Sequence, residues 1–275
     1  MHQAEWRPAA NTVVKHGISG AEEPETMQRR TPDRPGGQQP RLKLLTRDER
    51  VTSVALLIHG GTAASRDPVP RGSLALARMR LFAPAILDAA AGHGAAVALL
   101  RNRYRGWNEP DGDPVADAGW ALDEIGRRYG DVPVALVGHS MGGRAALRVA
   151  GHPAVRAVAA LAPWLPEGEP IAQLSGRTVL VAHGERDGVT SPAASLAYVR
   201  RAYAATDRIC FWQVGGARHA MLERPGLWHR LVRDFALGTL GIRALTPELA
   251  DALDAGALDL GARGPGGPRD AAPRG

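Results

Sequence analysis

Short apolar runs alternate with stretches of helical periodicity along most of this sequence. A continuous apolar run of strand length indicates a strand that is covered on both faces, because neither face needs polar residues. Such runs occur at residues 54–58, 95–100, 134–138, 155–161, 178–182 and 208–214. The alternation predicts an α/β fold with a mostly parallel central sheet and helices on both faces.

The helices are predicted from the same periodicity together with capping residues. We expect them over residues 74–91, 113–128, 144–150, 191–204 and 225–240. Pro84 is expected to break the first of these helices. Asp113 and Pro114 have the composition of an N-cap followed by a first helical residue. Residues 41–46 alternate polar and apolar side chains and predict an edge strand.

The two ends of the chain differ in composition from its centre. Residues 1–40 are rich in Pro, Gly, Gln and charge without periodicity, which predicts a disordered extension with Met27 as an alternative start. A single α/β domain is expected over residues 41–241. Residues 242–275 are predicted to form a tail, with a short helix near 247–258 followed by a disordered Gly/Pro/Arg segment.

Composition narrows the classes of partner. The chain has 275 residues and a net charge of +6, but lysine occurs only at Lys15 and Lys43. No basic run is interleaved with aromatic residues, as a nucleic-acid surface would require. The bias toward arginine, alanine and glycine is typical of a GC-rich bacterial genome. We therefore expect no nucleic-acid partner.

Cysteine content and apolar segments bear on location. Cys210 is the only cysteine, so no intramolecular disulfide can form, and its apolar neighbours predict a core residue. No apolar stretch is long enough to span a membrane, and no signal peptide is recognised. These features favour a cytoplasmic protein without a membrane span and leave its oligomeric state open.

The central motif is Gly138-His-Ser140-Met-Gly142, which lies between a predicted strand and an alanine-rich predicted helix. In a strand–turn–helix setting, a serine on a tight turn presents its hydroxyl to the surroundings. Glycines two residues before and two residues after it leave room for neighbouring backbone. The motif predicts a nucleophile at Ser140.

This motif resembles the nucleophile elbow of the α/β-hydrolase superfamily, and three more motifs carry the resemblance over residues 41–241. His59-Gly60-Gly61 resembles the family's oxyanion-hole turn. His183-Gly184-Glu185-Arg186-Asp187 resembles the turn with the triad acid, for which Glu185 is the alternative to Asp187. His219 follows the last predicted strand, where the family has its general base. The chain order of serine, acid and histidine is that of the superfamily.

The resemblance implies a role for each of these residues. The triad would comprise Ser140 as nucleophile, His219 as general base and Asp187 as the acid that orients the base. The backbone N–H groups of Gly61 and Met141 would form the oxyanion hole.

Two further residues are candidates for a substrate pocket at the same edge of the sheet. Trp164 follows a predicted strand, and would either wall the acyl pocket or serve in packing. Arg103 follows another strand, and would either bind an acidic substrate group or pair with the nearby Asp111 and Asp113. The segment between Trp164 and Thr178 is too short for the lid domain of many relatives. We therefore expect a small, capless protein with an open cleft.

Together, the motifs favour a serine hydrolase of carboxylesterase type that cleaves a small acyl ester or thioester. A serine peptidase of the same fold and a catalytically silent, hydrolase-like binding scaffold are the alternatives. The fold also resembles that of dienelactone hydrolases, but those enzymes typically use a cysteine where this chain has Ser140. No metal-ligand cluster or phosphate-binding glycine motif is evident, so we expect neither metal nor cofactor.

Overall fold

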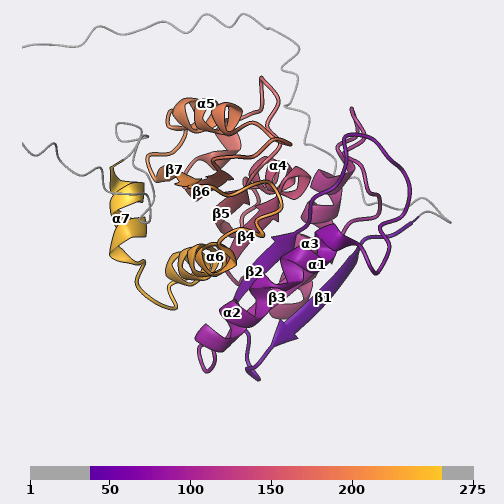
Figure 1. Ribbon diagram of the computed structural model, residues 1–275. Coiled ribbons are helices and arrows are strands. Elements are labelled where there is room, and N and C mark those ends of the chain that lie inside the picture. Colours follow the sequence, from indigo (N-terminus) through magenta and orange to yellow (C-terminus); the bar gives the residue numbers. More distant parts are fainter. Residues whose placement is uncertain (1–37, 256–275) are drawn as a thin grey trace, which may run out of the picture. The chain divides into compact units, whose positions relative to one another are not determined.

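A seven-stranded, mostly parallel sheet lies at the centre of the structure, a computed structural model that describes residues 38–255 (Figure 1). The strands are β1 (Arg41–Thr46), β2 (Ser53–Ile58), β3 (Ala95–Arg101), β4 (Val134–His139), β5 (Val155–Leu161), β6 (Thr178–Gly184) and β7 (Ile209–Val214). Their order is β1-β3-β2-β4-β5-β6-β7. The edge strand β1 is antiparallel to β3, and all other neighbours are parallel. The predicted fold class is confirmed.

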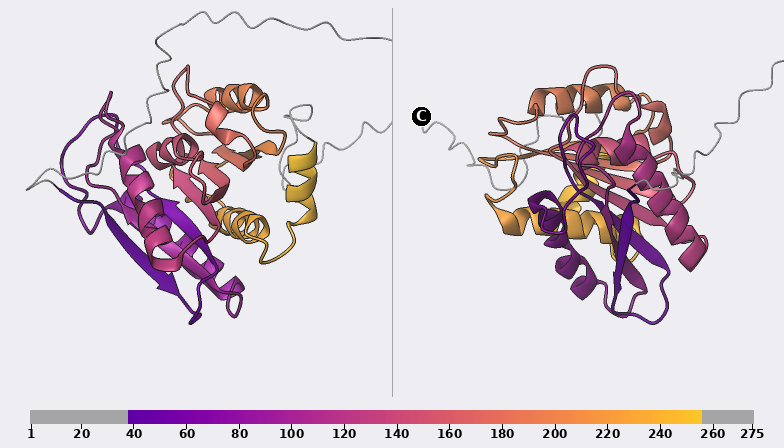
Figure 2. Two further views of the ribbon diagram at one scale, coloured as in Figure 1. Left: turned by 180° about the vertical axis from the view of Figure 1, so that it is seen from behind. Right: turned by 90° about the vertical axis from the view of Figure 1, so that its right-hand side faces the viewer.

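Helices cover both faces of this sheet (Figure 2). They are α1 (Leu74–Arg80), α2 (Phe82–Ala89), α3 (Asp113–Tyr129), α4 (Met141–Arg148), α5 (Pro192–Ala202), α6 (Pro225–Thr239) and α7 (Pro247–Asp254), with a 3-10 turn, η1, at Ala172–Leu174. Helices α3, α4 and α5 contribute to one buried cluster, and α1, α2, α6 and α7 contribute to another. The sheet therefore separates two hydrophobic cores.

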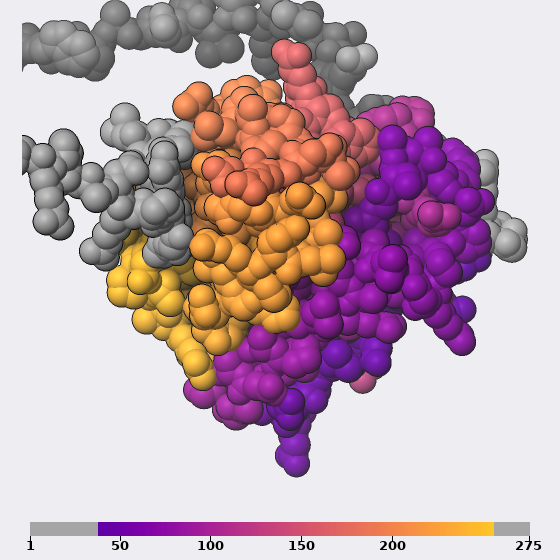
Figure 3. Space-filling model, in the orientation of Figure 1, coloured from indigo at the N-terminus to yellow at the C-terminus, as the bar shows by residue number. Residues whose placement is uncertain are grey.

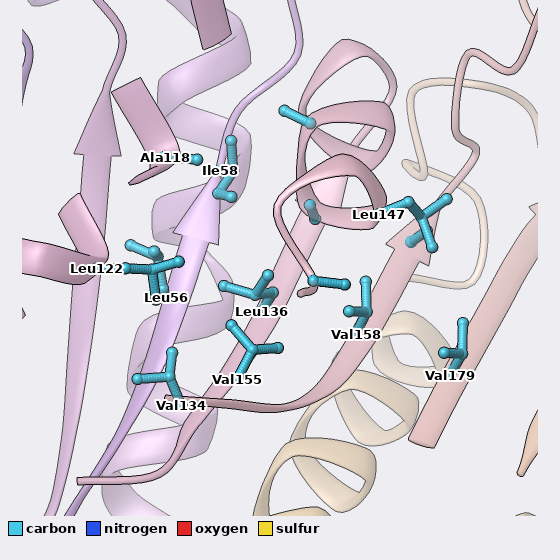
Figure 4. Packing of buried hydrophobic residues seen from close by; sticks show 14 of the residues in the cluster. Leu56, Ile58, Ala118, Leu122, Val134, Leu136, Leu147, Val155, Val158 and Val179 are labelled. Carbon is cyan, nitrogen blue, oxygen red and sulfur yellow. The ribbon is translucent and has the colours of Figure 1, made fainter. Parts of the chain in front are cut away.

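Alternation along the strands assigns each side chain to one of these cores. Leu56 and Ile58 of β2 lie in the same cluster as Leu122 of α3 (Figure 4). Leu57 belongs to the opposite cluster, because successive strand side chains point to opposite faces. Burial on both faces explains why these strands are continuously apolar in sequence.

Helices from distant parts of the chain meet on the second face. The purple segment that includes α2 borders the orange segment that includes α6 in Figure 3, and the two helices pack directly. The ring of Phe82 in α2 lies 5.0 Å from that of His229 in α6, between centroids.

The predicted helix over residues 74–91 is interrupted, but not at Pro84. Helix α1 ends at Arg80 and α2 begins at Phe82, so Pro84 lies in the first turn of α2. In a continuous helix, the ring of Pro84 would clash with the carbonyl of Arg80, four residues earlier. The break therefore occurs one turn before the proline, which is tolerated in a first turn.

Two helix starts also differ from the prediction. Gly112, with a φ of 59°, is the N-cap of α3, and Asp113 is the first helical residue. The Asp113 carboxylate is instead bound by Arg103 and Asn108. Helix α4 begins at Met141, directly after Ser140, and so leaves no loop between the strand and the helix.

The remaining predictions concern connections and ends. Among the described residues, the connection 162–177 contains only the turn η1, and it holds no lid domain. Leu249 and Leu253 of α7 are buried in the second core, so the packed structure continues past Gly241. Predictions for residues 1–37 and 256–275 lie outside the residues that the structure describes.

Candidate active site

The turn between β4 and α4 holds Ser140 in a strained conformation. Its φ is 56° and its ψ is −119°, a combination that side-chain-bearing residues rarely adopt. Such strain persists only where the surrounding structure enforces it, and it is typical of functional positions. Here Ser140 N–H donates to the Leu161 carbonyl (2.9 Å), and the Ser140 carbonyl accepts from Gly143 and Arg144.

The glycines of the motif are required by packing of backbone against backbone. A Cβ on Gly138 would lie 2.2 Å from the carbonyl oxygen of Gly142. A Cβ on Gly142 would lie 2.4 Å from the carbonyl oxygen of Ile58. Both distances are far below contact between non-bonded atoms. Helix α4 can therefore approach β2 and β4 closely only because these positions lack side chains.

The three predicted triad residues meet at the carboxyl edge of the sheet. Ser140 Oγ lies 3.1 Å from His219 Nε2. His219 Nδ1 lies 2.8 Å from Asp187 Oδ2. With the ring proton on Nδ1, His219 donates to Asp187 and accepts from the serine hydroxyl. This continuous chain is the geometry in which an imidazole removes a proton from a serine.

The Asp187 carboxylate is buried but well supplied with donors. Its side chain is 0% exposed, and Oδ1 accepts from the amides of Val189 (2.8 Å) and Thr190 (3.0 Å). Burial alone would raise the pKa of Asp187, but these amides and His219 lower it below the ordinary value. The carboxylate is therefore ionised at neutral pH. Glu185, the alternative acid, bonds instead to the amide of Gly216.

The two amides predicted for an oxyanion hole lie on either side of the serine turn. A Cβ on Gly61 would lie 2.6 Å from the Met141 side chain, so the two residues are adjacent. Met141 is the first residue of α4, and its N–H has no intrahelical acceptor. Within residues 38–255, the N–H of Gly61 donates to no acceptor of the chain. Both donors are thus available to a substrate oxygen.

His139 supports the site in a way that the sequence analysis missed. Its Nε2–H donates to the backbone carbonyl of His219 (2.9 Å), and the two rings lie 4.8 Å apart between centroids. Burial, together with the charge of His219, lowers the pKa of His139 to about 3. It is therefore a neutral residue that holds the loop of His219. The only feature of the sequence that could have indicated this role is the position of His139 directly before Ser140.

His59 is likewise a neutral buried residue. Its Nδ1–H donates to the Gly60 carbonyl (2.7 Å), and Nε2 accepts from the amide of Asn102 (3.1 Å). Burial lowers its pKa. His59 thus fixes the turn that carries Gly61, in agreement with a structural role for this histidine.

The guanidinium of Arg103 forms ion pairs with two carboxylates of α3. Its Nε lies 2.6 Å from Asp117, and its Nη2 lies 3.2 Å from Asp113. The Arg103 side chain is only 13% exposed. This is the ion-paired alternative considered for the sequence, with Asp117 in place of Asp111. The prediction that Arg103 binds an acidic substrate group is therefore corrected, because its guanidinium is paired within the protein.

Trp164 packs against a buried arginine behind the serine turn. Its ring lies 4.7 Å from the guanidinium of Arg144, which also stacks on Trp107 at 3.8 Å. Arg144 Nε bonds to Glu169 (2.5 Å), a buried residue of the connection between β5 and β6. The Trp164 amide donates to the Ser140 carbonyl (3.2 Å). Trp164 is therefore a packing residue beside the site, and a role as pocket wall stays a prediction.

Within residues 38–255, no group of three or more His, Cys, Asp or Glu side chains is placed to hold a metal ion. In the same part of the chain, no helix is both long enough and apolar enough to cross a membrane. Cys210 is buried, and burial raises the pKa of its thiol to about 12, so it is not a thiolate nucleophile.

Comparison with known proteins agrees with this architecture. Residues 54–174 match the model of a family described as alpha/beta hydrolase fold. No curated protein matches the chain. Est1E from Butyrivibrio proteoclasticus, with ferulic acid bound, has a TM-score of 0.53 and 16% identity over 74% of this chain and 96% of its own.

Two further solved structures are similar at the level of the fold. A serine hydrolase without lid from Xanthomonas campestris has a TM-score of 0.54 and 15% identity over 72% of this chain and 88% of its own. A thermophilic esterase from Thermogutta terrifontis, with butyrate bound, has a TM-score of 0.54 and 15% identity over 76% of this chain and 91% of its own. The match over residues 54–174 and the shared sheet show that this chain has the α/β-hydrolase fold.

Proposed function

We propose that this protein is a serine hydrolase that cleaves a carboxylic ester or thioester through an acyl-enzyme on Ser140. The observation that supports it most strongly is the unbroken hydrogen-bond chain from Ser140 Oγ through His219 to Asp187. Strain at Ser140 and two available amides beside it are consistent with the same role. The substrate would be a small molecule with an acyl group.

The proposed reaction has two balanced halves. Ser140 Oγ attacks the carbonyl carbon while its proton passes to His219 Nε2. The developing oxyanion accepts hydrogen bonds from Gly61 and Met141, each worth about 3 kcal/mol in a well-formed site. His219 then protonates the leaving alcohol or thiol, and the acyl group stays on Ser140. Water, deprotonated by His219, releases the carboxylic acid and restores the serine.

Two observations favour ester hydrolysis over peptide hydrolysis. They are the ligands bound in similar structures and the short connection between β5 and β6. Two of the similar structures hold carboxylic acids, ferulic acid and butyrate, in proteins of the same fold. The connection 162–177 leaves the catalytic edge without a lid domain in the described residues. A serine peptidase remains the alternative within this mechanism, and a silent binding scaffold is the alternative outside it.

A fluorophosphonate probe, which reacts only with activated serines, tests the proposal directly. We expect the full-length protein to be labelled and Ser140→Ala to be unlabelled, with turnover about 10⁶-fold lower. p-Nitrophenyl esters of varied chain length, beside aminoacyl anilides, separate esterase from peptidase. An unlabelled, folded wild type would favour the binding scaffold and refute the proposal.

A further inference from the structure

The triad acid lies between two imidazoles, of which the proposed mechanism uses one. Asp187 Oδ2 is 2.8 Å from His219 Nδ1 and 3.1 Å from His183 Nε2. His183 Nδ1 in turn lies 2.9 Å from Ser195 Oγ, on α5. A second serine–histidine pair therefore reaches the same carboxylate oxygen. Nothing in the fold or in the reaction already described assigns a role to it.

The contacts fix the proton positions on His183. Asp187 is ionised, so the nitrogen that faces it must carry a proton, since two lone pairs would otherwise repel each other. His183 Nε2–H therefore donates to Asp187. Burial lowers the pKa of His183, so Nδ1 is unprotonated and can only accept. Ser195 must then donate its hydroxyl proton to Nδ1. The Asp187 carboxylate thus sets the tautomer of His183, and the Ser195 hydroxyl holds its ring in place through the bond to Nδ1.

This second pair is not a second catalytic centre. His183 and Ser195 are both 0% exposed. No substrate can reach the Ser195 hydroxyl in this arrangement. The titratable groups that face His183 are Asp187 and His219. His183 Nε2 also lies 3.3 Å from the Thr190 hydroxyl, which is 3.0 Å from the same Asp187 oxygen, so the contacts of Nε2 converge on the triad acid.

We propose that His183, whose ring is held in place by Ser195, is a positioning residue for the catalytic triad; this inference rests on the proposed function. The Val189 and Thr190 amides hold Oδ1 of Asp187, and His183 holds Oδ2 against rotation away from His219. The donated bond also withdraws charge from Oδ2. Loss of this donor therefore changes the pH dependence of activity as well as kcat.

Two substitutions separate positioning from packing. Ser195→Ala removes the hydroxyl that holds the His183 ring, at a helix position where alanine is favourable. We expect kcat to fall about tenfold, the effect of one net hydrogen bond, while KM is unchanged. Ser53→Ala is the matched control, because Ser53 is also buried and its hydroxyl has no hydrogen-bond partner among residues 38–255. The control is expected to leave kcat and the pH profile unchanged.

Substitution of His183 itself tests the donor. Gln places an amide N–H near the position of Nε2, whereas Met fills a similar volume without a donor. We expect His183→Met to lower kcat about 100-fold, the scale of a misplaced catalytic group, and His183→Gln to recover most of that loss. Equal losses in the two variants would show that packing alone matters, and would overturn the proposal.

The decisive readout does not depend on turnover. ¹⁵N NMR of histidine-labelled, full-length protein distinguishes protonated from unprotonated ring nitrogens. We expect His183 to be protonated at Nε2 only, both in the wild type and in Ser195→Ala, because the Asp187 carboxylate requires a donor there. An Nδ1–H tautomer in the wild type would overturn the proposal whether or not the protein is labelled by fluorophosphonate. Absent labelling with the expected tautomer would refute the hydrolase function alone.

Discussion

Helices α3 and α4 begin at the same edge of the sheet, side by side, and are anchored there in opposite ways. Each follows a residue with positive φ, 59° at Gly112 and 56° at Ser140. Glycine adopts this conformation without cost, whereas a serine there is strained. At α3, side chains hold the helix start, since Arg103 binds both Asp113 and Asp117. At α4, backbone packs directly on backbone.

The glycines inside the two helices reflect this difference. A Cβ on Gly142 of α4 would meet two carbonyl oxygens, at 2.4 and 2.6 Å. A Cβ on Gly119 of α3 would meet nothing within 4 Å. Helix α4, which follows the proposed nucleophile Ser140, is thus fixed by steric contact with the sheet. A helix that only supports the edge is fixed by ion pairs, and its glycine is dispensable.

The largest effect on stability is expected at the start of α3. Arg103→Met leaves Asp117, whose side chain is 0% exposed, without its guanidinium partner. Breaking a buried pair on one side costs about 3–5 kcal/mol in the free energy of unfolding, which urea denaturation measures. Arg66→Met is the control, because Arg66 and Asp111 form an exposed pair whose loss should cost below about 1 kcal/mol. Equal losses would contradict the ion-pair anchor.

A smaller loss of stability, joined to a loss of activity, is expected in α4. Gly142→Ala forces the helix away from the Ile58 carbonyl, which should cost about 1–3 kcal/mol. The accompanying displacement of Ser140 should lower kcat/KM about 100-fold. Urea denaturation and ester hydrolysis measure the two effects. Wild-type activity in this variant would show that the contact does not position the serine.

Acid should destabilise the β4–α4 region through His139. Its pKa is about 3 in the folded state, below the ordinary 6.5, so the unfolded chain binds a proton that the folded chain does not. Stability is therefore full above about pH 6.5 and falls as the pH drops toward 3, by about 1.4 kcal/mol per unit. His139→Gln keeps a donor for the His219 carbonyl but binds no proton. Its unfolding free energy, measured from pH 7 to about pH 4, should fall less steeply than that of the wild type.

The smallest effect is expected at Gly119, and its sign is opposite. Gly119→Ala adds a methyl group in open space within α3 and reduces the entropy of the unfolded chain. It should raise the free energy of unfolding by about 0.5–1 kcal/mol. A thermal melt detects this as a higher Tm with unchanged hydrolysis. A decrease in Tm would mean that α3 is held as tightly as α4.

The sequence predicted the strands and the order of the motifs better than it predicted the helix starts. Continuous apolar runs mark strands buried on both faces, and those strands were located closely. The break before Pro84 and the cap at Gly112 were misplaced, because both depend on where a steric clash or a carboxylate partner lies in space. A local pattern carries no information about such partners.

What the sequence determined by itself is the alternation of strands and helices and the residue types after each strand. From it follow the sheet, its carboxyl edge, and Ser140, Asp187 and His219 as the groups that parallel strands bring together. Only the tertiary structure decided that Arg103 forms ion pairs within the protein. It also decided that His139 and His183 are buried, neutral residues beside the triad. The reason is physical. Hydrophobic periodicity is local, whereas burial, charge pairing and tautomer depend on neighbours from distant parts of the chain.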